Sequence, residues 1–189
     1  GLRFFPDDSP AAGCNDQACS LDACAAPLVA PAPLTEAPAA SDPQQKALVD
    51  AVNAKSPGGE TPMYAALGGA EQWAQSNADE AHRTAVVLVT DGEPTTCNTD
   101  VAAIAGLAKA AHDAKGVLTY AIGMPGSNAA QLDQIAAAGG TDKAFLADAG
   151  ALSAKLIEAL TSIQKAQIAC TFDMPVASQP GDTVDPGKV

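Results

Sequence analysis

The sequence is poor in basic, histidine and aromatic residues. Its 189 residues include 10 Lys and Arg against 22 Asp and Glu, which gives a net charge of −12 at pH 7. A nucleic-acid-binding protein needs a basic surface, so this charge argues against that class and suits a protein that attracts cations. Aromatic residues make up only 4% of the chain, and alanine supplies much of its 47% apolar content. A core is still possible, and this composition favours closely packed helices.

Long apolar runs and the motifs of common enzymes are also missing. No apolar run approaches the roughly 18 residues of a membrane-spanning helix. The sequence has no Gly-x-Ser-x-Gly, no phosphate-binding loop and no Gly-x-Gly-x-x-Gly after a predicted strand. Gly123 and Gly126 form an isolated Gly-x-x-Gly, which is typical of a turn. His82 and His112 are predicted at the surface, and neither lies beside a nucleophile.

The alternation of predicted strands and helices indicates an α/β fold. Residues 84–89 form a short apolar run rich in valine, which is typical of a strand buried on both faces. Further strands are predicted at residues 2–5, 117–122 and 143–146, with a short edge strand at 27–30. The strand–helix units span roughly thirty residues each, which predicts a mostly parallel sheet with helices on both faces.

Capping signals place the helices between these strands. A helix begins after Asp42, and its apolar stripe consists of Leu48, Val49 and Val52. A second helix begins after Thr61, a third begins at Asn98 or Thr99, and a fourth spans residues 128–138. The last helix, after residue 148, is built on Leu152, Leu156, Leu160 and Ile163.

Three cysteines lie close together in a loop rich in proline, alanine and aspartate. The chain has five in all: Cys14, Cys19, Cys24, Cys97 and Cys170. The cluster is typical of a disulfide-stapled loop in an extracellular protein. Zinc is the competing interpretation, but the spacing fits zinc poorly and neither histidine is near in the sequence. We therefore expect disulfides.

Two polar residues occupy positions where such a fold binds ligands. Asp91 lies two residues after the strand at residues 84–89, and open α/β sheets bind ligands at the carboxyl ends of their strands. Thr61 offers a hydroxyl at the start of a helix, after two glycines. A carboxylate and a hydroxyl suit a hard cation such as Mg²⁺ or Ca²⁺. The alternatives are a plain turn at Asp91 and Gly92 and a helix N-cap at Thr61.

Two motifs carry a resemblance to a known family. Residues 58–67, GGETPMYAAL, followed by residues 86–94, VVLVTDGEP, resemble the von Willebrand factor A domain. In that family the two stretches hold the second and third elements of a metal-ion-dependent adhesion site. The resemblance implies a Rossmann-like α/β domain over residues 1–169, followed by a polar tail over residues 170–189. It also implies that Thr61 and Asp91 are ligands of Mg²⁺, or of Ca²⁺ or Mn²⁺ in its place.

One element of the family's site is missing from this sequence. The family's first element is Asp-x-Ser-x-Ser at the end of the first strand. Residues 7–11 have Asp and Ser in step, but Ala11 replaces the last serine, and the stretch follows what resembles the family's second strand. We therefore expect that the first strand and helix precede Gly1. The metal site would then be incomplete in this chain, and an apolar seam along residues 84–89 would be uncovered.

The resemblance implies a protein-binding or adhesion module and not an enzyme. The cation would keep one coordination position open for an acidic residue of a partner protein. The cysteine-bearing loop and the many small residues resemble bacterial secreted or lipoprotein members, which implies an exported protein. The alternatives are a metal-assisted hydrolase of similar shape, for which only Glu93 offers a general base, and a metal-free structural domain.

The expected topology also bears on the cysteines. It brings Cys97 and the loop of three cysteines to the same edge of the sheet. We predict two disulfides among Cys14, Cys19, Cys24 and Cys97, with the pairing left open. Cys170 ends the last helix, which runs toward the opposite end, and is predicted to be unpaired.

Overall fold

The centre of the molecule is a parallel sheet, as the order of strands and helices predicts. The computed structural model describes residues 1–7, 13–38, 40–79, 81–148 and 150–167. The strands, in spatial order, are β1 (Ala85–Thr90), β2 (Leu118–Gly123) and β3 (Phe145–Leu146). Val87 of β1 lies opposite Tyr120 of β2, and both strand pairs are parallel. The carboxyl ends of the strands therefore meet at one edge of the sheet.

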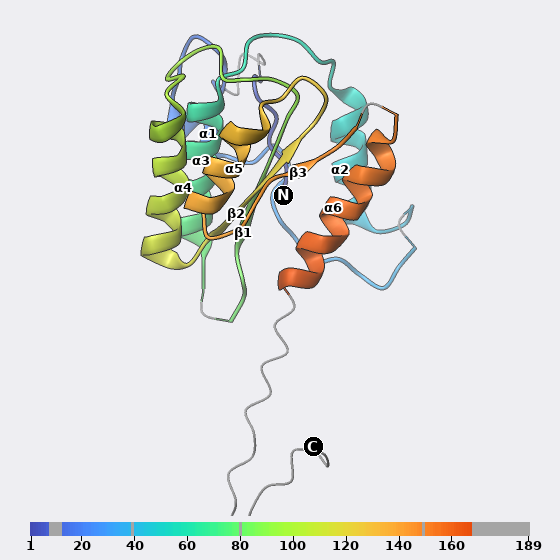
Figure 1. Ribbon diagram of the computed structural model, residues 1–189. Coiled ribbons are helices and arrows are strands. Elements are labelled where there is room, and N and C mark those ends of the chain that lie inside the picture. Colours follow the sequence, from blue (N-terminus) through green and yellow to red (C-terminus); the bar gives the residue numbers. More distant parts are fainter. Residues whose placement is uncertain (8–12, 39, 80, 149, 168–189) are drawn as a thin grey trace, which may run out of the picture.

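Helices cover both faces of this sheet (Figure 1). The helices in the described part of the chain are α1 (Leu21–Ala25), α2 (Pro43–Ala54), α3 (Met63–Asn77), α4 (Val101–Lys115), α5 (Ala129–Ala138) and α6 (Leu152–Gln167). On one face α3, α4 and α5 pack against Leu88 and Ala121 of the sheet. On the other face Ile163 of α6 packs with Tyr120 and Ile122. None of the helices in the described part of the chain is long and apolar enough to cross a membrane.

Side-chain caps explain where most of these helices begin. The predicted cap of α2 is confirmed, because the Asp42 side chain accepts a hydrogen bond from the backbone N–H of Gln45. The predicted start of α4 at Asn98 or Thr99 is wrong. The Asn98 side chain accepts a hydrogen bond from the backbone N–H of Asp100, and Asp100 is the residue that caps the helix. Residues 98–100 therefore lie before α4, in a turn closed by the Asn98 side chain.

The N-terminal segment is less regular than expected. Residues 2–5 are not a strand of the sheet, because their one ladder contact is an isolated antiparallel bridge between Leu2 and Val29. The edge strand expected at residues 27–30 is reduced to the same bridge. The long loop expected after residue 6 contains α1, which is capped by the Ser20 side chain.

An apolar groove separates residues 2–5 from β1. It has a volume of about 320 Å³, and Ala66, Leu67 and Ala70 of α3 line it together with residues of β1. In the part of the chain that the structure describes, β1 is hydrogen-bonded to a strand along one edge only. The burial expected for β1 on both faces is therefore incomplete, and most of its residues are half-buried.

The apolar stripe predicted for α2 does not reach the core. Val49 is 57% exposed and Val52 is 55% exposed, and no residue of this helix is buried. The stripe predicted for the last helix is also shifted, because α6 buries Ala159 and Ile163 while Leu160 is 45% exposed. The sequence identified residues that share a face, but it did not establish that every face meets a partner.

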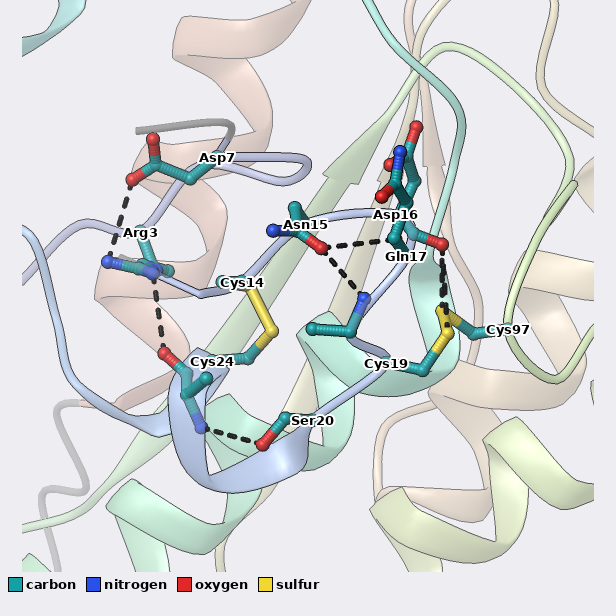
Figure 2. The surroundings of a disulfide bond; sticks show 12 residues. Arg3, Asp7, Cys14, Asn15, Asp16, Gln17, Cys19, Ser20, Cys24 and Cys97 are labelled. Atoms are coloured by element: carbon teal, nitrogen blue, oxygen red, sulfur yellow. Dashed lines mark hydrogen bonds and ion pairs between the residues drawn. A yellow bond between two sulfur atoms is a disulfide. The ribbon is translucent and has the colours of Figure 1, made fainter. Parts of the chain in front are cut away.

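Two disulfides form among the four cysteines, as predicted, and the structure supplies the pairing that the sequence left open. Cys14 is bonded to Cys24, and Cys19 is bonded to Cys97 (Figure 2). The zinc interpretation is therefore wrong for these four residues. Cys170 lies outside the described residues, so its predicted unpaired state stays a prediction.

Candidate functional site

Asp91 stands at the carboxyl end of β1, where the chain turns out of the sheet. The preceding residue, Thr90, is buried. Its hydroxyl donates a hydrogen bond to the carbonyl oxygen of Gly92 and lies 3.3 Å from the Gly92 backbone nitrogen. The Thr90 carbonyl oxygen accepts a hydrogen bond from Met124 at the end of β2. Strand pairing and this tight turn hold the backbone on either side of Asp91, whose side chain is exposed.

Thr61 lies two residues before the start of α3. The alternative role as a helix N-cap is wrong, because Pro62 occupies the cap position and makes no side-chain capping bond. The Thr61 hydroxyl lies over Gly92, 3.6 Å from the position that a Cβ atom would occupy there. Because this hydroxyl does not cap α3, it can serve as an oxygen ligand.

A single cleft of about 440 Å³ brings Thr61 and Asp91 together. Residues 58–60 form part of its wall, and Phe4 and Phe5 form another part. Lys55 also lines the cleft, and its Nζ lies 3.6 Å from the Asp7 carboxylate and 5.9 Å from the centre of the Phe4 ring. The two candidate ligands therefore lie at the same end of the sheet, as expected.

The loop after β2 contacts the loop that carries Asp91. Gly126 has a φ of 111°, and a Cβ atom added there would meet the carbonyl oxygen of Asp91. Asn128, the N-cap of α5, donates a hydrogen bond from Nδ2 to Oε1 of Glu93 at 2.9 Å. The loops that follow the two neighbouring strands are thus packed against each other.

Comparison with models of known protein families shows which family this chain belongs to. The model of the von Willebrand factor type A domain matches residues 30–160, which is more than half of the sequence. The chain belongs to this family. Von Willebrand factor type A domains mediate protein–protein interaction and adhesion, and they often bind a divalent metal. No curated protein matches the chain.

The match covers the two motifs of this von Willebrand factor type A domain but not its whole disulfide network. Thr61, Asp91 and Cys97 lie within residues 30–160, whereas α1 and the first three cysteines precede them. The disulfide between Cys19 and Cys97 therefore links the matched region to a segment outside it.

The chemistry of the cleft suits a hard cation, although its donor set is small. Thr61 and Asp91 supply a hydroxyl and a carboxylate, the oxygen ligands that Mg²⁺ and Ca²⁺ prefer. Among the described residues, no group of three or more His, Cys, Asp or Glu side chains is placed to hold a metal. Mg²⁺ takes about six ligands, so water and other oxygens would have to complete its shell.

Sequence reasoning missed the residue that connects the two motifs. The backbone N–H of Thr95 donates to the carbonyl oxygen of Thr61 at 3.2 Å, and the N–H of Thr61 donates to Oγ1 of Thr95 at 2.8 Å. Nothing in the local pattern around Thr95 indicates a partner 34 residues away. This reciprocal pair fixes the approach of the loop after β1 to the start of α3.

Proposed function

We propose that this von Willebrand factor type A domain is a protein-binding module whose cleft takes a divalent cation on Thr61 and Asp91. The observation that carries the proposal is that these two oxygen donors, from motifs 30 residues apart, line one cleft at the carboxyl end of the sheet. The Thr61 hydroxyl and the Asp91 carboxylate would hold Mg²⁺, directly or through water.

The partner would be a protein that presents an acidic residue. A cation held by only two side chains keeps coordination positions open, and a carboxylate is a ligand that a hard cation accepts. The net charge of −12 supports a role for the cation, because it would offset repulsion between this chain and an acidic partner. The same charge argues against a nucleic-acid partner.

We also propose that the protein is exported and is not an enzyme. Its two disulfides favour an oxidising compartment. Glu93, the one candidate for a general base in the hydrolase alternative, is exposed and accepts a hydrogen bond from Asn128. A binding role requires only the cleft and its donors.

The test is a thermal melt with and without Mg²⁺ on the wild type and on Thr61→Val and Asp91→Asn. A ligand that binds only the native state stabilises it, by about 2.7 kcal/mol at a concentration 100 times Kd. We expect Mg²⁺ to raise the Tm of the wild type and a chelator to reverse the rise. Both variants should lose most of the response, since Thr61→Val removes the hydroxyl and Asp91→Asn replaces the charged carboxylate by a neutral amide, while each keeps the shape of the side chain.

Glu93→Gln is the matched control. It removes an exposed carboxylate two residues from Asp91 but keeps an amide oxygen for Asn128. We expect this variant to respond to Mg²⁺ like the wild type. A wild type whose Tm is insensitive to Mg²⁺, or an Asp91→Asn variant that responds fully, would contradict the proposal.

A further inference from the structure

The loop formed by residues 91–97 is anchored at two points outside β1. Toward the cleft, the reciprocal hydrogen bonds described above join Thr95 to Thr61. Two residues further on, Cys97 is covalently bonded to Cys19, and the hydroxyl of Thr96 donates to the carbonyl oxygen of Asp16 at 3.2 Å. The segment that carries Asp91 is therefore held between α3 and the cysteine-bearing loop.

The backbone at both ends of this disulfide is in an unfavourable conformation. Cys97 has a φ of 66° and Cys19 has a φ of 48°, and in the described residues these are the non-glycine residues with positive φ. Such conformations persist only where the surrounding structure imposes them. Without the covalent bond, we expect residues 95–97 to relax toward ordinary backbone angles and to move away from Thr61.

The two disulfides differ in their accessibility. Cys14 is 0% exposed and Cys24 is 1% exposed, and they pack with Ala65 in the interior. Cys19 and Cys97 are only half-buried. Thiol–disulfide exchange requires access of the attacking thiolate to a sulfur atom. A reductant in solution should therefore reach the Cys19–Cys97 bond first.

We propose that the Cys19–Cys97 disulfide positions the cation cleft and that its reduction weakens cation binding. An external dithiol would supply the electrons. Its thiolate attacks one sulfur atom, the Sγ–Sγ bond breaks, and the second thiol of the reductant resolves the mixed disulfide. Two electrons and two protons pass to Cys19 and Cys97, which become thiols, and the dithiol becomes a disulfide. The part of this inference that concerns the cation rests on the proposed function.

The first experiment identifies the bond that opens. The oxidised protein is treated with a limiting amount of dithiothreitol, alkylated and mapped by peptide mass spectrometry. We expect alkylation of Cys19 and Cys97 while Cys14 and Cys24 remain bonded. Simultaneous opening of both bonds, or earlier opening of Cys14–Cys24, would overturn the redox part of the proposal.

The second experiment compares matched variants that each lack one disulfide. Cys19→Ala/Cys97→Ala should raise the Mg²⁺ dissociation constant, measured by calorimetry, by about tenfold or more, the size of effect typical of residues that orient metal ligands. Cys14→Ala/Cys24→Ala should change it by less than about twofold. Equal effects in the two variants, or no effect in the first, would overturn the positioning role. The selectively reduced wild type replaces Cys19→Ala/Cys97→Ala if that variant does not fold, with the oxidised wild type as its control.

Hydrogen exchange of the Thr61 and Thr95 amides supplies a readout that does not depend on the cation. Both amides should exchange faster without the Cys19–Cys97 bond and at the wild-type rate without Cys14–Cys24. Unchanged exchange in the first variant would overturn the inference. Failure of the wild type to bind Mg²⁺ would instead overturn the proposed function, and the exchange rates would still decide whether the disulfide positions the loop.

Discussion

Replacement of Glu71 by glutamine should change how the stability of this protein depends on pH. Glu71 lies on α3 and is only 1% exposed. Its Oε1 accepts a hydrogen bond from the hydroxyl of Thr119 on β2 at 2.7 Å. Its Oε2 is buried and has no hydrogen-bond partner among the described residues. Burial raises the pKa of Glu71 from 4.5 to about 7, and the hydrogen bond from Thr119 opposes this only in part.

The size of the pH effect follows from the pKa of Glu71 in the native state and in the unfolded chain. Each factor of ten is about 1.4 kcal/mol, so a pKa of about 7 in the native state against 4.5 in the unfolded chain corresponds to about 3 kcal/mol. The native state holds the proton more tightly, so this contribution is fully present below about pH 4.5. It is lost as the pH rises toward 7 and does not change further above that. A loss of this size matters, because whole domains are stable by only about 5–15 kcal/mol.

The assay is urea unfolding of the wild type and Glu71→Gln between about pH 4.5 and pH 8. Other titrating groups are common to both proteins, so the difference between their unfolding free energies isolates Glu71. We expect this difference to shift by about 3 kcal/mol in favour of the glutamine variant across the range. The cost of burying the amide N–H₂ of the glutamine does not vary with pH, so it does not affect how this difference changes with pH. A difference that stays flat with pH would refute the reasoning.

Thr119→Val provides an independent check on the same site. It removes the hydrogen bond that lowers the pKa of Glu71, so the loss of stability should move to higher pH. In the Glu71→Gln background the same substitution should leave the pH dependence unchanged. A pH-dependent effect of Thr119→Val in that background would show that another group is responsible.

Two further predictions concern the periphery of the fold. Val49→Lys should change the free energy of unfolding by less than about 0.5 kcal/mol, because Val49 is 57% exposed. Leu67→Ala should cost about 2–5 kcal/mol, because Leu67 is only 1% exposed. Comparable losses for the two variants in urea unfolding would show that α2 is packed against the core. Gly126→Ala should lower the Tm more than Gly116→Ala. Both glycines have positive φ, but the added Cβ at Gly126 would meet the Asp91 carbonyl oxygen, while Gly116 has open space around it. Equal losses in a thermal melt would mean that the loop around Asp91 yields easily.

Local signals were sufficient where a residue acts on its own neighbours along the chain. The apolar run that forms β1, the cap at Asp42 and the left-handed Gly116 at the end of α4 were all predictable. Each depends on the chemistry of a few consecutive residues. The placement of Thr61 and Asp91 at one edge of the sheet followed from the strand order and the family motifs.

Contacts between distant segments were beyond these signals. The exposure of Val49 depends on what lies opposite α2, and periodicity within α2 carries no information about that. The hydrogen bonds between Thr61 and Thr95, and the choice of Cys19 as the partner of Cys97, depend on how two loops are brought together. Glu71 looks like an ordinary helical glutamate in sequence, and only the tertiary structure places it against Thr119.

The shallow packing of α2 has a consequence for how the molecule opens. The polar contacts of α2 lie mainly near its two ends. The Asp42–Thr35 and Gln44–Ala30 hydrogen bonds lie at its start, and the ion pair between Lys55 and Asp7 lies at its end. Segments that bury little apolar surface unfold locally at a fraction of the global free energy. Local opening of α2 should therefore cost less free energy than global unfolding, so we expect a protease to cleave within this helix while the sheet and α3–α5 remain folded.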